Sequence, residues 1–182
     1  MPKIGAVFRV ALALFISAPF LARAYDDHVT VSPKGTFKIV QHYDDKNGFS
    51  ETLHFNSSPD PDVILEGEIS WAGDYYIAPD DRWILRIQKT GSGDNTSYIY
   101  FIEKNGSLWR MEQPLGDMGF DFLRHQLGGL PSGLYHAGIE FISWDMKNHL
   151  LHFSIHASSD PGTGGVEKTL TYQLLQNKIV EP

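Results

Sequence analysis

The chain contains no cysteine, and this absence removes several possibilities. No disulfide can form, no thiol can act as a nucleophile, and no lipobox cysteine exists to carry a lipid. Small exported domains that cannot bury a sufficient core usually rely on disulfides. This chain is long enough to bury a core without them.

Basic residues are also scarce, since 15 Lys and Arg face 22 Asp and Glu, for a net charge of −7. An acidic surface repels phosphate backbones and anionic lipid headgroups. No run of Lys and Arg creates a local exception. The composition therefore argues against nucleic acid and membrane surfaces as partners.

The first 24 residues have the pattern of a secretory signal peptide. Lys3 and Arg9 give a positive start, an apolar run follows at 10–21, and the small residues of 22–24 suit a signal peptidase. The apolar run is shorter than the ~20 residues that a membrane span needs. We therefore expect export, cleavage after Ala24 and no transmembrane segment in the mature protein.

Cleavage there leaves one domain of 158 residues, 25–182. It removes three basic residues and no acidic ones, so the mature net charge is −10. Export without cysteine is typical of a bacterial periplasmic or secreted protein. Glycosylation sequons would favour a eukaryotic source, but such short motifs arise by chance in turns; they stand at Asn56, Asn95 and Asn105.

The mature chain alternates apolar and polar residues in short segments separated by turn residues, the pattern of antiparallel strands. Asn-Gly pairs at 47–48 and 105–106 are typical of tight hairpin turns. We predict an all-β antiparallel meander, packed as a sandwich or small barrel. The predicted strands are 36–43, 49–55, 83–88, 98–103, 107–111, 150–156 and 170–175.

One short helix is expected. Asp117 or Asp121 could cap a helical turn that runs to Leu127, and Gly128-Gly129 would end it.

A short motif recurs along the chain. Residues 32–40 (SPKGTFKIV) and 78–85 (APDDRWIL) share a polar turn with proline that precedes a hydrophobic strand, and 144–153 (WDMKNHLLHF) is a looser copy. The motif resembles the turn-and-strand signature of WD40-like, TolB-type β-propeller repeats. The resemblance implies blade-like hairpins. Propeller blades need ~40 residues each and at least four are required, so a closed propeller is not expected in 158 residues.

Two segments could suggest metal sites. On a helix, His149, His152 and His156 would share a face, but the segment alternates with period two. On a strand, His152 and His156 lie ~13 Å apart and cannot chelate one ion alone. The acidic turn 44–48 lacks the terminal carboxylates of a calcium loop. We predict no metal and no cofactor.

No sequence signature of nucleophilic catalysis is present. Paired acids could serve a glycosidase, which needs two carboxylates ~5–9 Å apart. Each pair lies at a predicted turn, where Asp is favoured for its backbone hydrogen bonds. The candidates are Asp26/Asp27, Asp60/Asp62, Asp80/Asp81 and, beside them, Asp74.

Aromatic residues give the candidate binding site. Trp71, Tyr75 and Tyr76 gather near one turn, where exposed rings could contact a sugar or a protein. Trp83 and Trp109 lie inside predicted strands and are expected to fill the core. We predict a binding or protein-interaction module of the bacterial cell envelope, with an envelope protein or a glycan as partner. The alternative is a glycan- or peptidoglycan-acting hydrolase whose carboxylates are brought together by the fold.

Overall fold

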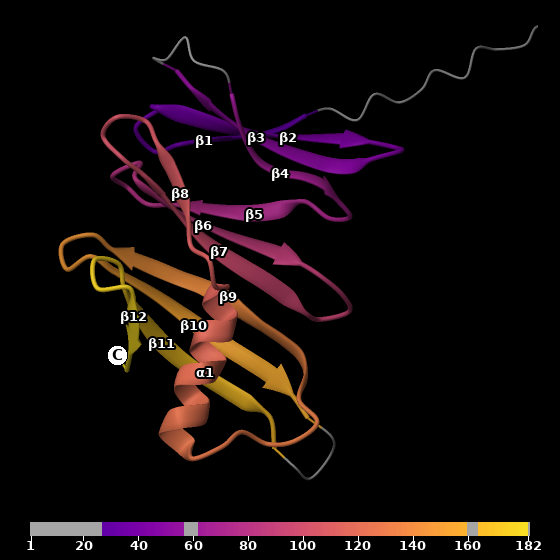
Figure 1. Ribbon diagram of the computed structural model, residues 1–182, viewed down its shortest axis with the longest axis vertical. Coiled ribbons are helices and arrows are strands. Elements are labelled where there is room, and N and C mark those ends of the chain that lie inside the picture. The colour runs from indigo at the N-terminus through magenta and orange to yellow at the C-terminus, as the bar shows by residue number, and fades with distance from the viewer. Residues whose placement is uncertain (1–26, 57–61, 160–163, 182) are drawn as a thin grey trace, which may run out of the picture.

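A computed structural model describes residues 27–56, 62–159 and 164–181. Its described residues form three antiparallel sheets of four strands and one helix (Figure 1). In each sheet the strands follow one another in chain order, so every sheet is a simple meander. The predicted all-β meander is therefore confirmed. The sheets are stacked along the long axis of the molecule, and no closed barrel or propeller forms among the described residues.

The first sheet contains β1 (His28–Val31), β2 (Phe37–Asp44), β3 (Gly48–Phe55) and β4 (Val63–Ile69). The second contains β5 (Gly73–Ile77), β6 (Trp83–Lys89), β7 (Asn95–Ile102) and β8 (Leu108–Arg110). The helix α1 (Leu115–Leu127) leads to the third sheet. That sheet contains β9 (Tyr135–Asp145), β10 (Leu150–Ser158), β11 (Val166–Gln173) and β12 (Lys178–Val180).

The Asn-Gly turns lie where the sequence predicts them. Gly48 begins β3 with φ of +76°, and Gly106 separates β7 from β8 with φ of +88°. Asp44 stabilises the turn between β2 and β3, because its Oδ1 accepts hydrogen bonds from the amides of Lys46 and Asn47 at 2.8 and 2.9 Å. The acidic segment 44–48 is thus a hairpin turn.

The three motif copies occupy equivalent positions. Each lies in the turn between the first and second strands of its sheet. In the first two, an amide–carbonyl bond closes the turn, from Gly35 to Ser32 and from Asp81 to Ala78. Gly35 and Asp81 both have left-handed backbones, with φ of +68° and +61°. The repeat in the sequence therefore corresponds to a repeated meander.

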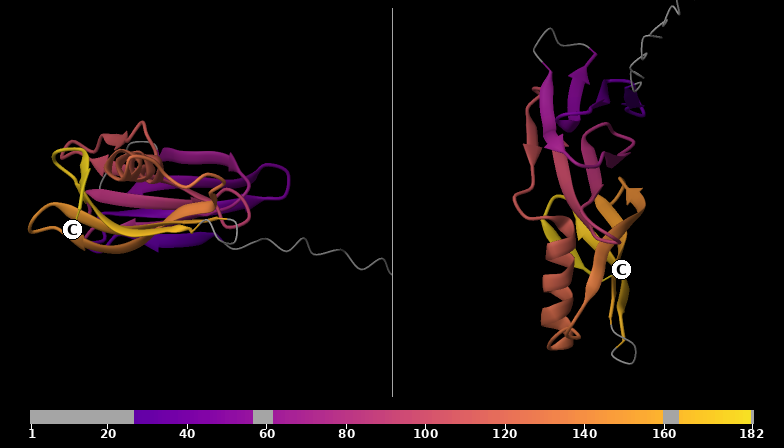
Figure 2. Two further views of the ribbon diagram at one scale, coloured as in Figure 1. Left: turned by 90° about the horizontal axis from the view of Figure 1, so that it is seen from below. Right: turned by 90° about the vertical axis from the view of Figure 1, so that its right-hand side faces the viewer.

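The second sheet has both faces covered. Ile84, Tyr100 and Ile102 pack against the first sheet. The intervening residues Leu85 and Ile99 face the opposite way and pack with the third sheet and α1. Alternation along β6 and β7 thus supplies two hydrophobic cores from the same strands. Figure 2 shows the helix lying along one side of the lower part of the stack.

The predicted helix exists, but it begins earlier than expected. Pro114 is its N-cap residue and provides no side-chain cap, so the expected capping by Asp117 or Asp121 is wrong. Proline suits a helix start because its missing amide would have no intrahelical acceptor there. The helix ends as predicted, at Gly128 in a left-handed conformation.

Five strands were not among those predicted: β1, β4, β5, β9 and β12. Strands β1 and β12 have only four and three residues, too few for a clear alternation. In β9 the pairing with β10 shifts register twice, which disrupts the period of two. The predicted signal peptide and the residues Asp26 and Asp60 lie outside the described residues.

Candidate functional site

The three aromatic residues predicted as a binding site lie in different surroundings. Trp71 stands in the turn between β4 and β5 and is 43% exposed. Tyr75 and Tyr76 are neighbours on β5, so they point to opposite faces of the second sheet. Tyr75 packs towards the first sheet, and Tyr76 stacks on Phe141 of the third, with ring centroids 4.5 Å apart. The structure therefore leaves Trp71 as the exposed member.

The Tyr75 hydroxyl belongs to a buried polar network between the first two sheets. It donates to Glu51 at 2.6 Å, and the Arg86 guanidinium donates to the same carboxylate oxygen at 2.6 Å. The other oxygen of Glu51 accepts from the Gly73 amide and the Gln41 side chain, at 2.6 and 2.8 Å. Glu51 is fully buried and Arg86 is 1% exposed. Sequence alternation alone could not reveal this network, because its members come from four different strands.

The network keeps Glu51 ionised. Burial alone would raise its pKa, but hydrogen bonds from Tyr75 and Gly73, together with the charge of Arg86, lower the pKa below its usual value. Burial and the neighbouring Glu51 charge raise the pKa of Tyr75. A carboxylate with a lowered pKa is a poor general acid at neutral pH. Glu51 and its partners Tyr75 and Arg86 therefore act as a polar link between the first and second sheets.

Asp81 is the best-connected of the candidate catalytic acids. Its carboxylate accepts from the hydroxyls of Ser32 and Thr36, both at 2.7 Å, and from the amide of Lys34 at 3.1 Å. Burial raises its pKa, but these hydrogen bonds outweigh that effect and lower it. Asp80, its neighbour, accepts from the Arg82 amide at 3.0 Å. Asp81 thus ties the first motif turn to the second.

Trp109 was expected in the core, and that expectation is wrong. It is 61% exposed, because β8 is an edge strand whose aromatic face is uncovered at this position. Its register partner on β7 is Phe101, whose ring lies 4.4 Å from that of Trp83. Trp83 is half-buried and packs against the core between the second sheet, the third sheet and α1, as expected of a core residue. Three rings thus cross one face of the second sheet.

The histidines of β10 behave as the alternation predicts. His152 and His156 are half-buried and alternate with the buried residues Leu151, Phe153 and Ile155. His152 shares a hydrogen bond of 2.9 Å with the Thr171 hydroxyl. Across the described residues, no group of three potential metal ligands comes together.

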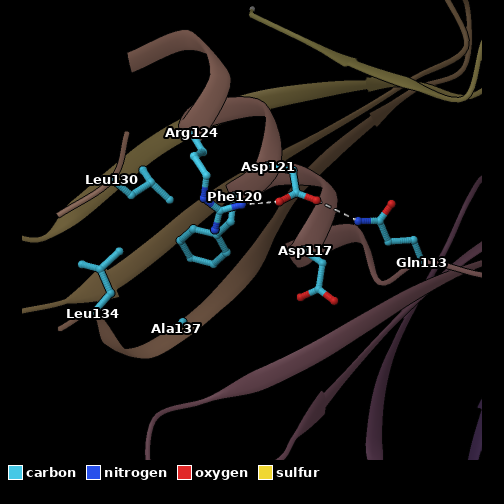
Figure 3. A pocket seen from close by; sticks show the side chains of 8 residues that line it. All are labelled: Gln113, Asp117, Phe120, Asp121, Arg124, Leu130, Leu134 and Ala137. Carbon is cyan, nitrogen blue, oxygen red and sulfur yellow. Dashed lines mark hydrogen bonds and ion pairs between the residues drawn. The ribbon is translucent and has the colours of Figure 1, made fainter. Parts of the chain in front are cut away.

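An open groove of about 420 Å³ lies between α1 and the segment that leads to β9 (Figure 3). Leu130, Leu134 and Ala137 form an apolar wall, and Phe120 of the helix lies beside them. Polar side chains of α1 and the preceding turn complete the lining: Gln113, Asp117, Asp121 and Arg124. The groove was not predicted, because its walls come from segments that the sequence marks only as a helix and a Gly-Pro-rich loop.

Of the two carboxylates in the groove, one has an ion-pair partner among the described residues and the other has none. Asp121 pairs with Arg124 and accepts a hydrogen bond from Gln113 at 3.1 Å. Asp117 is exposed in the first helical turn, where the helix dipole favours a carboxylate. It has no side-chain partner in the described part of the chain. The groove therefore combines an apolar wall with one uncompensated negative charge.

Fold and site together define an all-β protein built of stacked four-stranded meanders. No protein-family model matches the chain, and no curated protein matches it in sequence. Among solved structures, it is similar to TolB from Acinetobacter baumannii at 10% identity and a TM-score of 0.33. The match covers 84% of this chain and 43% of that one, so this chain spans less than half the length of that structure.

No helix within the described ranges is both long and apolar enough to cross a membrane.

Proposed function

We propose that residues 25–182 form an exported binding module of the bacterial cell envelope that takes a segment of a partner protein into the α1 groove. The single observation that carries this proposal is the combination of an apolar wall with the uncompensated Asp117 in one groove. A matching segment carries an aliphatic or aromatic side chain beside a Lys or Arg. The apolar group would pack on Leu130 and Leu134, and the cation would lie near Asp117.

The overall charge supports a basic partner. The chain carries a net charge of −7, and −10 after the predicted cleavage. An acidic surface attracts a cationic segment at long range and raises its rate of association.

Trp71 is proposed as a second contact, for a protein or a glycan. Its ring is exposed and Lys89 lies 5.9 Å from its centroid, so a flat aromatic face stands beside a cation. Of the other two predicted contact residues, Tyr75 uses its hydroxyl on Glu51, and Tyr76 is stacked on Phe141. We therefore propose that Tyr75 and Tyr76 position β5 and do not contact the partner themselves.

The alternative, a hydrolase acting on glycans, has less support. It requires one carboxyl with a raised pKa and a second, ionised one across the substrate. The buried candidates, Glu51 and Asp81, both have lowered pKa values and are already hydrogen-bonded by the fold.

Site-specific photo-crosslinking tests the binding proposal. A photoreactive residue replaces Leu134 in the groove or, as the matched control, the exposed Glu140 on β9. Each protein is exposed to envelope extract of the organism that makes it. We expect a discrete crosslinked protein from position 134 that Asp117→Lys abolishes. The same products from both positions, or products unaffected by Asp117→Lys, would contradict the proposal.

Export is tested separately by the mass of the protein recovered from the periplasm or medium. Cleavage after Ala24 predicts a chain that begins at Tyr25. Recovery of the full-length chain from the cytoplasm alone would contradict export.

A further inference from the structure

The two ends of the sheet stack differ in character. The outer face of the third sheet carries polar residues of β10, among them His152 and His156. The outer face of the first sheet instead exposes large aliphatic side chains: Val29 is 46% exposed, Val31 59% and Ile64 75%. Single exposed apolar residues are ordinary, but a group of them on one flat sheet marks a contact surface.

Register places these side chains in one row. Val29 pairs with Val40, Val40 with Thr52, and Thr52 with Ile64. The inward-facing neighbours Ile39 and Leu53 are fully buried, so the row itself points outward. The row crosses all four strands at one height, with Val29 on one edge strand and Ile64 on the other.

The charges on this face are nearly balanced, in a molecule that is otherwise acidic. Two outward histidines each contact a carboxylate, His42 with Asp27 at 2.7 Å and His54 with Asp62 at 2.6 Å. Lys38, the register partner of His54, adds one positive charge. Another copy of this face can therefore approach without the repulsion that the net charge of −7 imposes elsewhere.

We propose that the outer face of the first sheet binds the same face of a second copy of this chain. A two-fold axis parallel to the strands places β1 of one copy over β4 of the other. Val29 and Val31 then pack on Ile64 of the partner subunit, and the row meets itself in reverse order. The face is self-complementary under this operation, as a two-fold interface requires.

The size of the face predicts how tight this dimer is. The four strands lie ~4.8 Å apart and have four, eight, eight and seven residues, so their face covers roughly 430 Å². Two such faces bury roughly 860 Å², which is in the range of weak, transient contacts. A hollow of about 390 Å³ beside Ile64, lined also by His42 and Ser50, leaves room for a partner side chain. We therefore expect a weak, concentration-dependent dimer, formed independently of the α1 groove.

Sedimentation velocity of residues 25–182 over a range of concentrations tests the dimer. We expect dimer at high concentration, and monomer at every concentration for Ile64→Lys. The matched control is Ile142→Lys, which changes an isoleucine on β9 that is 48% exposed and should still dimerise. If Ile64→Lys loses its circular dichroism spectrum, Val31→Lys replaces it. A monomeric parent chain, or dimers that survive both first-sheet substitutions, would overturn the proposal.

The absence of cysteine allows a direct test of the arrangement. Val29→Cys and Ile64→Cys chains are treated with a short bis-maleimide, separately and as an equal mixture. Our geometry predicts crosslinked dimer mainly in the mixture. Crosslinking of each chain alone that is as efficient as in the mixture would overturn this arrangement. No crosslinking at all would overturn the dimer, as expected if the first sheet binds another protein instead.

Discussion

At the scale of single residues, two buried carboxylates hold the first and second sheets together. Glu51 and Asp81 accept hydrogen bonds from groups across the boundary between these two sheets. Each joins segments far apart in the chain, Glu51 to Arg86 and Asp81 to Ser32. Charged hydrogen bonds of this kind contribute more than neutral ones, and an orphaned partner is costly.

Asp81→Asn tests the link between the two motif turns. Asparagine also tolerates the left-handed backbone, so the substitution removes mainly the charge. We expect a loss of about 1–3 kcal/mol in unfolding free energy at pH 7, measured by urea titration. Because the folded-state pKa of Asp81 is lowered, its contribution is present above the unfolded value of ~3.9 and disappears as the pH falls through the folded value.

The difference in unfolding free energy between the parent protein and Asp81→Asn should therefore become smaller as the pH is lowered from 5 towards 2. A difference that stays constant with pH would show that the carboxylate charge is not what Asp81 contributes.

The Glu51–Arg86 pair is tested by a double-mutant cycle. Glu51→Gln leaves the Arg86 guanidinium buried without an anion, which costs about 3–5 kcal/mol. Adding Arg86→Met removes that orphaned charge, so the double variant should be more stable than the sum of the two single losses predicts. Urea unfolding of the four proteins measures the coupling. Strict additivity would contradict a direct interaction.

At the scale of elements, the hairpins depend on glycine where the turn is tight and crowded. Both Gly35 and Gly48 have positive φ, but they differ in surroundings. A Cβ at Gly48 would lie 2.4 Å from the Ile69 carbonyl oxygen, whereas one at Gly35 meets nothing within 4 Å. The β2–β3 turn is therefore constrained by β4 as well as by its own backbone.

Alanine substitutions separate these two effects. Gly35→Ala should lower the unfolding free energy by about 1–2 kcal/mol, the cost of a left-handed backbone for a residue with a Cβ. Gly48→Ala should cost clearly more, because β4 must also move. Thermal unfolding followed by circular dichroism measures both, and equal losses would contradict the steric role of Ile69.

At the scale of the whole molecule, the second sheet belongs to both hydrophobic cores. Ile84 and Leu85 are adjacent on β6, and each is fully buried in a different core. Neither neighbouring sheet can lose its packing without exposing one face of the second sheet.

This sharing predicts a single cooperative unfolding transition. Tryptophan fluorescence and far-ultraviolet circular dichroism should give the same urea midpoint, as for a two-state domain. Two separate transitions would show that the sheets unfold independently.

The sequence by itself determined the local features: the strands with strong alternation, the Asn-Gly turns, the end of α1 at Gly128 and the equivalence of the motif turns. These depend on residues a few positions apart, so short patterns record them. Only the tertiary structure decided which faces are covered. It left Trp109 exposed, buried Glu51 with Arg86, directed Tyr75 and Tyr76 to opposite sheets, and formed the α1 groove. Each of these outcomes depends on contacts between strands distant in the chain, which alternation along one strand cannot specify.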